Sequence, residues 1–327
     1  MARTNTLDSK TFGYWAHLAI QKYFQKIIKH EAEVIKDKDP EALHQMRVGM
    51  RRLRTAVTSL APALELPKAA QEKKIAAVAR QLGQLRDLDV LQDALQNHYL
   101  PTLPNSEQGI LKKVLTAVGK QRQKSLEQVR TTLKEQRYQK LKQAFQDWLE
   151  IPTYGELAQT SIDDILPELL LPSVSKLFLD SAWLIGVKLA AGEINVPSPL
   201  NCEIVVHLLN DHGDSLHRLR KQAKGVRYQM ELFTDFYGFQ YQDYLKDIKA
   251  IQSILGRIQD SAVLAAFLTD TLNSEMSVKL PTLAAKLMAN RYQAWQEWRT
   301  LQQRYLKFQT RRDFYQEILQ TVPTSAE

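Results

Sequence analysis

The chain has 327 residues, with 44 lysines and arginines against 36 aspartates and glutamates and a formal net charge of +8. This length fits one large domain or two of ordinary size, and a hydrophobic share of 44% can form a core, which excludes wholesale disorder. Glycine and proline occur only 12 times each, which favours long helices over a turn-rich β protein. The single cysteine, Cys202, cannot form an internal disulfide, so we expect a reducing compartment.

Apolar residues recur with the period of an α-helix along nearly every long segment, and no segment shows the two-residue alternation of a strand. The predicted helices span residues 9–38, 41–61, 68–98, 106–150, 173–192, 202–211, 214–236, 239–273 and 280–321. Breaker residues gather near the middle, at Pro152, Pro167 and Pro172. The sequence therefore predicts an all-α domain over 1–327, made of two four-helix-type bundles, 9–150 and 173–321, with a linker at 151–172.

Neither a signal peptide nor a membrane span is predicted. The first twelve residues, MARTNTLDSKTF, lack the apolar run of a secretory signal. The most apolar stretch, residues 177–191, is too short to span a bilayer and contains Asp180 and Lys188. We therefore expect a cytoplasmic protein with no membrane partner.

Two segments repeat a pattern of basic residues. Residues 43–54 read LHQMRVGMRRLR and residues 216–227 read LHRLRKQAKGVR, so that His44 and His217 lie 173 residues apart. The segments LGQLRDLDVL and LGRIQDSAVL follow, and their glycines, Gly83 and Gly256, are also 173 residues apart. Because unrelated matches would not be expected to share one offset, we predict a duplicated unit with two similar bundles related by a pseudo-two-fold axis.

The basic residues of each repeat fall on one helical face, in a stripe about 80° wide and about 15 Å long. The first stripe consists of His44, Arg47, Arg51 and Arg54. The second stripe consists of His217, Arg220, Lys224 and Arg227. Arg52 points away from the first stripe, and Lys221 lies just beside the second. Neither repeat contains an acid, and their nine basic residues exceed the net charge of the whole chain.

A row of basic side chains of this kind suits a linear polyanion. The planar guanidinium of arginine can bind phosphate oxygens bidentately, and histidine can donate an N–H or gain a proton beside phosphate. The alternative is that acids on neighbouring helices, with Asp87 and Asp260 as candidates, neutralise the stripes. Binding of single-stranded nucleic acid is disfavoured because aromatic residues for base stacking are lacking, with only Tyr228 nearby. Phosphate contacts alone can still hold RNA.

The repeated segments resemble the CHAD family, the conserved-histidine α-helical domains, and the likeness extends over residues 14–319. The resemblance implies two four-helix bundles around a basic central pore that binds inorganic polyphosphate, and some family members sit at polyphosphate granules. Matched by motif, the pore residues are His44, Arg47, Arg51, Arg52, Arg54, His217, Arg220, Lys221, Lys224 and Arg227. Weaker candidates are Lys73, Arg86 and Lys246. In the second copy, Gln259 corresponds to Arg86 and Gly225 corresponds to Arg52. We therefore expect these two arginines to be less central to the pore than the other candidates.

Other motifs are better explained by local structure. The series Cys202, His207, His212 and His217 has metal-ligand residues, but five-residue steps on a helix do not converge, so no metal site is predicted. Gly213–Leu216 matches a hydrolase signature in letters, yet Asp214 or Ser215 reads better as a helix N-cap. We therefore expect no cofactor and a binding protein, not an enzyme. The alternatives are a scaffold for an acidic protein or RNA, and an enzyme that acts on polyphosphate.

Overall fold

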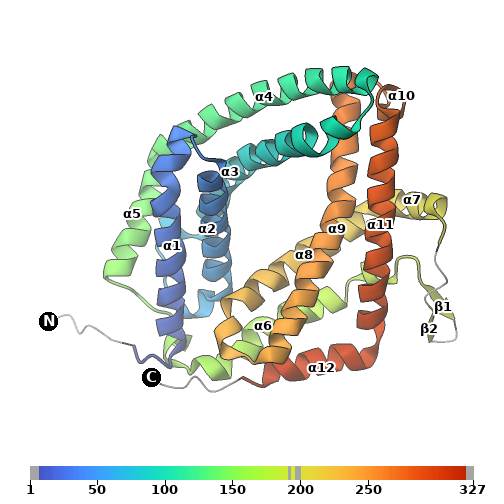
Figure 1. Ribbon diagram of the computed structural model, residues 1–327. Helices are drawn as coiled ribbons and strands as arrows, with labels where there is room; N and C mark the ends of the chain where they lie inside the picture. The colour runs from blue at the N-terminus through green and yellow to red at the C-terminus, as the bar shows by residue number, and fades with distance from the viewer. Residues whose placement is uncertain (1–6, 191–192, 196–199, 322–327) are drawn as a thin grey trace. The chain divides into compact units, whose positions relative to one another are not determined.

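The computed structural model describes residues 7–190, 193–195 and 200–321 (Figure 1). These residues form two compact units. The first unit contains the chain up to Pro101 together with Leu115–Ile165, and the second contains Thr102–Val114 together with the chain from Leu166 onward. The predicted all-α class is confirmed, and the division into units follows different boundaries from the predicted bundles because residues 102–114 belong to the second unit.

The first unit is built from five long helices and short helical turns. Its helices are α1 (Phe12–Lys36), α2 (Pro40–Ser59), α3 (Glu72–Asp93), the larger part of α4 (Asn105–Lys134) and α5 (Gln136–Glu150). Single helical turns lie at Ala61–Ala63, Lys68–Ala70, Ala94–Tyr99, Leu100–Thr102 and Glu156–Gln159. Helix α2 packs against both α1 and α3.

Helix α2 begins where the sequence predicts. The carboxylate of Asp39 accepts a hydrogen bond from the backbone N–H of Glu41 at 2.8 Å, and Pro40 occupies the first helical position. Its buried positions include Leu43, Met46, Met50, Leu53 and Val57, which recur every three or four residues. Burial of this face leaves the stripe of basic residues on the remaining surface of the helix.

The second unit contains the remaining elements. They are most of α6 (Ile162–Phe178), β1 (Lys188–Ala190), β2 (Glu193–Asn195), α7 (Cys202–Asp211), α8 (Gly213–Leu232), α9 (Phe239–Leu272), α10 (Met276–Lys279), α11 (Pro281–Leu306) and α12 (Phe308–Leu319). Single turns lie at Ser181–Leu184 and Thr234–Phe236. Helix α8 packs on α9, which in turn packs on α11. The two strands form an antiparallel hairpin in which Lys188 is opposite Asn195, and this hairpin was not predicted.

The expected linker at 151–172 differs most from the structure. Helix α6 starts at Ile162 and runs through Pro167 and Pro172. An interior proline costs a helix about 3 kcal/mol, but each fully buried aliphatic side chain contributes about 1.5–3 kcal/mol. The fully buried side chains of α6 are Ile162, Leu166, Leu170, Val174 and Leu177. Their burial at helical spacing outweighs the cost of the two prolines, so the helix continues through them. The helix predicted at 173–192 begins at Ile162 and ends at Phe178 instead.

Other predicted helices are divided or shortened. The segment predicted at 106–150 breaks at Glu135 between α4 and α5, and the segment at 280–321 breaks at Lys307 between α11 and α12. The N-cap of α8 is His212, so the prediction of Asp214 or Ser215 as its cap is wrong. Asp214 lies in the first turn, where a negative charge favours the helix dipole.

Residues 102–114 join the second unit through Glu107, whose residue surface is 4% exposed. Its carboxylate accepts hydrogen bonds from the backbone N–H groups of Thr282 at 2.9 Å and Leu283 at 3.2 Å. These groups open α11 and have no carbonyl partner within the helix, so Glu107 caps α11. Burial alone would raise the pKa of Glu107, but the hydrogen bonds from Thr282 and Leu283 outweigh burial and lower it.

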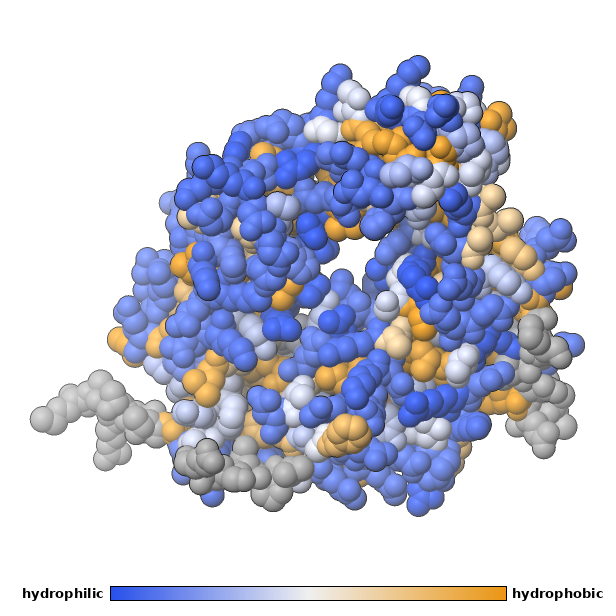
Figure 2. Space-filling view, viewed as in Figure 1, coloured by the Kyte–Doolittle hydropathy of each residue, from blue (hydrophilic) through white to orange (hydrophobic). Residues whose placement is uncertain are grey.

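The face in Figure 2 is mainly hydrophilic, with hydrophobic residues scattered between the polar ones. Within the described ranges, no helix combines the length and the apolar character that crossing a membrane requires.

Candidate functional site

The first stripe lies on α2, where its members differ in burial. His44, Arg47 and Arg51 are half-buried, and Arg54 is exposed. His44 is close enough to Arg47, Arg51 and Arg86 for their charges to affect its pKa, so α2 and α3 bring these groups together. The structure thus gathers His44, Arg47, Arg51 and Arg86 into one cationic cluster of the first unit.

Arg47 is held against α3 by two neighbours. Its Nη2 donates a hydrogen bond to Asp87 Oδ1 at 3.2 Å. Its guanidinium passes over Gly83, where a Cβ atom would lie 3.6 Å from Nε. The group nearest to the place of a Cβ atom on Gly83 is therefore the Arg47 side chain.

Arg220 repeats this arrangement in the second unit. Its Nη1 lies 3.3 Å from Asp260 Oδ1. A Cβ atom on Gly256 would lie 3.4 Å from both Nε and Nη2 of Arg220. The two units therefore share one local geometry, in which an arginine of the stripe crosses the glycine of the next helix and meets the aspartate one turn further on.

The outer arginine of each stripe is also paired with a carboxylate. Arg54 forms an ion pair with Glu72 of α3. Arg227 bonds to Glu231 at 2.9 Å, four residues along α8, and to Gln252 of α9 at 3.3 Å. Acids on the same or neighbouring helices thus compensate part of the stripe's charge, as the alternative interpretation of the sequence held. Sequence analysis missed Glu72, which no local pattern reveals, and Glu231, which the four-residue spacing from Arg227 could have revealed.

The remaining predicted residues are placed less uniformly. Arg52 lies over the ring of Tyr23 in α1, 5.9 Å from its centroid, so it leaves the stripe as the helical angles predicted. Lys246 bonds to Asp243 on its own helix at 2.8 Å, and Lys73 is exposed. Lys221 is exposed, and its charge acts on His217.

Arg86 belongs to a partly buried ion network in the first unit. Its Nη1 is 4.0 Å from Asp89 Oδ2, and Asp89 also accepts a hydrogen bond from Arg122 Nε at 2.7 Å. Arg122 donates two further bonds of 2.8 Å to Asp37. Burial raises the pKa of Asp89, and the hydrogen bond and the charge of Arg122 oppose this effect. Arg86 thus has an acidic partner, Asp89, within its own unit.

Both stripe histidines have a lowered pKa. For His44 the main cause is burial, which Glu41 opposes and Arg86, Arg51 and Arg47 reinforce. For His217 burial is again the main cause, followed by the charges of Lys221 and Arg220. Both imidazoles are therefore neutral at physiological pH and can donate one N–H each.

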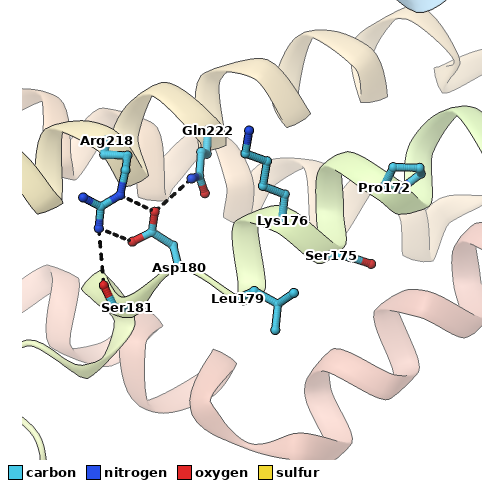
Figure 3. A pocket seen from close by; sticks show the side chains of 8 residues that line it. All are labelled: Pro172, Ser175, Lys176, Leu179, Asp180, Ser181, Arg218 and Gln222. Carbon is cyan, nitrogen blue, oxygen red and sulfur yellow. Dashed lines mark hydrogen bonds and ion pairs between the residues drawn. The ribbon is translucent and has the colours of Figure 1, made fainter.

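A separate cavity of about 550 Å³ lies between α6 and α8 (Figure 3). At its wall, Asp180 accepts hydrogen bonds from Arg218 at 2.9 and 3.0 Å and from Gln222 at 2.9 Å. Burial alone would raise the pKa of Asp180, but these bonds and the backbone N–H of Ala182 lower it. Arg218 and Gln222 therefore brace the turn after α6, and the residues lining this cavity include none of the second stripe.

The cysteine and histidine series is divided by the end of a helix. Cys202 and His207 lie on α7, His212 lies between the helices, and His217 lies on α8. In the parts of the chain that the structure describes, no group of three histidine, cysteine, aspartate or glutamate side chains is arranged to hold a metal ion.

Comparison with known proteins places this geometry in a family. No curated protein matches the chain. The crystal structure of the CHAD domain from the plant Ricinus communis is similar, with 22% identity, a TM-score of 0.57 and coverage of 98% of both chains. PptA from Streptomyces chartreusis is similar in fold, with 15% identity, a TM-score of 0.65 and coverage of 90% of this chain and 100% of that chain. The sequence model of the CHAD domain matches residues 18–269, which is more than half of the chain, and the chain therefore belongs to the CHAD domain family.

Proposed function

We propose that this protein binds inorganic polyphosphate through the two stripes. One observation carries the proposal: each unit places a histidine and three basic residues on one helical face, with the same glycine and aspartate beside the second member. The CHAD family, to which the chain belongs, is associated with polyphosphate.

The chemistry of the stripes fits phosphate better than nucleic acid. Arginine presents a planar fork to phosphate oxygens, lysine a point charge, and neutral histidine an N–H. Tyr228, the aromatic residue beside the second stripe, is 7% exposed and lies 5.6 Å from the Arg227 guanidinium. Its ring is therefore buried among protein atoms and is closed to base stacking, on which binders of single-stranded nucleic acid depend.

A competition titration tests the ligand class. Long-chain polyphosphate, single-stranded RNA and free phosphate are compared at equal total charge and at several salt concentrations. We expect polyphosphate to bind tightest, with an affinity that falls steeply as salt rises because binding releases counterions. Tighter binding of RNA at every salt concentration would contradict the proposal.

A finer proposal is that the two stripes line one basic channel and take a single polyphosphate chain. The repeated spacing of the two stripes supports this idea, since one repeating polymer suits two similar surfaces. Polyphosphates of increasing defined length provide the test. We expect affinity to rise sharply once a chain can reach both stripes, whereas a smooth rise with charge alone would contradict a shared channel.

We also propose that the protein binds polyphosphate without cleaving it. The stripes supply cations and imidazoles. The carboxylates beside the stripes are already paired with the stripe arginines. The test is incubation with polyphosphate, followed by measurement of released phosphate and of phosphohistidine. Release of phosphate that depends on His44 or His217 would overturn this part of the proposal.

A further inference from the structure

Two exposed carboxylates lie beside the cationic stripes, where an anion-binding surface would be expected to avoid negative charge. The side chains of Asp87 and Asp260 are 72% and 70% exposed. Each faces the second member of its stripe, Arg47 or Arg220. A carboxylate in this position repels an approaching phosphate chain, so its presence in both copies calls for a compensating benefit.

The contact geometry indicates what this benefit is. In the contact with Arg47, Asp87 Oδ1 meets one terminal nitrogen of the guanidinium at 3.2 Å, and Asp260 Oδ1 meets one terminal nitrogen of Arg220 at 3.3 Å. A guanidinium has five N–H donors, so a single contact of this kind leaves most of them for other acceptors. An exposed ion pair adds little to folding stability, so stability alone does not explain the two aspartates.

The glycines define the second half of the arrangement. Each guanidinium crosses the helix backbone at Gly83 or Gly256, with its nearest nitrogen 3.6 Å or 3.4 Å from the place of a Cβ atom. The aspartate lies four residues after the glycine, which is about one turn along the same helix face. The glycine provides a flat surface, and the aspartate fixes one end of the guanidinium.

We propose that Asp87 and Asp260 are positioning residues, which hold Arg47 and Arg220 across Gly83 and Gly256 with their remaining N–H groups directed to phosphate oxygens. This inference rests on the proposed binding of polyphosphate. It assigns Asp87 and Asp260 a part in ligand recognition, because pre-oriented arginines lose less freedom when the ligand binds.

The competing explanation is that the aspartates only balance charge in the ligand-free protein. Substitutions of equal charge separate the two explanations. Asn retains a carbonyl oxygen that can accept the arginine N–H, whereas Ala removes the acceptor, and both remove the negative charge. Charge balance predicts equal behaviour of the two substitutions, and positioning predicts different behaviour.

The experiment compares the full-length Asp87→Asn/Asp260→Asn variant with the Asp87→Ala/Asp260→Ala variant, using polyphosphate of one defined length. We expect the Asn variant to bind at least as tightly as the wild type, and the Ala variant to bind about tenfold more weakly than the Asn variant. The slopes of affinity against salt should be equal in the two variants because their charge is equal. Thermal unfolding of each variant shows that the folded state is retained.

The outcomes separate this inference from the proposed function. If the wild type binds polyphosphate and the Asn and Ala variants bind equally well, positioning is wrong and the proposed function stands. If the wild type binds no polyphosphate, both are wrong.

Asp164 on α6 is exposed and provides the control, since the Asp164→Asn and Asp164→Ala variants should bind polyphosphate equally.

Substitution of the glycines gives an independent measurement. Gly83→Leu with Gly256→Leu should weaken binding about as much as the Asp→Ala variant, because the larger side chain occupies the place of the guanidinium. Wild-type affinity in a folded Leu variant would overturn the proposal.

Discussion

The α2–α3 pair of the first unit and the α8–α9 pair of the second repeat one arrangement with different surroundings. Both have the histidine, the glycine-crossing arginine with its aspartate, and an outer arginine paired with a glutamate. They differ at the third stripe position, which is Arg51 or Lys224, and at the outer glutamate, which comes from α3 in one unit and from α8 itself in the other.

This difference separates shared features from local ones. The third position keeps its positive charge, although a planar guanidinium in Arg51 is replaced by the ammonium group of Lys224. Such a replacement fits contact with a polyanion of uniform charge. Arg52 and Arg86 have no basic counterpart, and each has a partner within its own unit, Tyr23 or Asp89. We infer that the shared residues form the binding surface and that Arg52 and Arg86 serve the first unit's packing.

The largest expected effect comes from reversing charge at the third position in both copies. Arg51→Glu with Lys224→Glu should weaken polyphosphate binding by about a hundredfold or more at low salt, because two attractive contacts become repulsive. The salt slope should also fall by about two. Isothermal titration measures both quantities, and circular dichroism confirms that the helices remain.

A matched control has the same change of charge away from the stripes. Lys140 on α5 and Lys279 on α10 are exposed, and Lys140→Glu with Lys279→Glu should leave most of the affinity intact. Equal losses in the two double variants would mean that overall charge, and not the stripes, determines binding.

Single substitutions test whether the two copies are equivalent. Arg47→Ala and Arg220→Ala should each weaken binding by about tenfold, because each removes one pre-oriented arginine. Arg52→Ala should change affinity little, since its side chain is directed to Tyr23. A large loss for one of the two stripe arginines and none for the other would show that the two copies have different roles.

Protonation of the histidines should give a smaller effect, of a few-fold. The pKa of His44 and of His217 is lowered in the free protein by burial and nearby cations, and bound phosphate would raise it. Binding therefore takes up protons, so affinity should increase as pH falls below the pKa of the complex and level off below the pKa of the free protein. Titrations across this pH range provide the measurement.

The corresponding variant is His44→Gln with His217→Gln, which should remove this pH dependence and retain binding. If the variant keeps the wild-type pH profile, the proton uptake arises elsewhere.

The smallest expected effect concerns Arg86, whose position in the second copy is Gln259. Arg86→Gln should weaken binding by less than about threefold. Arg86 is paired with Asp89, and the corresponding position of the second copy, Gln259, has no positive charge. A loss as large as that of Arg47→Ala would place Arg86 among the binding residues and make the two copies unequal.

The sequence alone predicted the all-α class and the stripes, because the helical period determines which side chains share a face. It left open whether Asp87 and Asp260 pair with arginines, since that depends on how two helices are set against each other and on side-chain rotamers. It missed α6 because Pro167 and Pro172 are strong local breakers, and only the burial of residues such as Leu166 and Leu170 decides in favour of a helix. Glu107 as the cap of α11 was equally hidden, since its partners Thr282 and Leu283 are distant in sequence.

The most direct test of the account is a crystal structure of the protein with a short polyphosphate of defined length. We predict phosphate oxygens within hydrogen-bond distance of Arg47 and Arg220, with Asp87 and Asp260 still bonded to these arginines. Phosphate bound only elsewhere, such as in the cavity beside Arg218, with both stripes empty, would contradict the central claim.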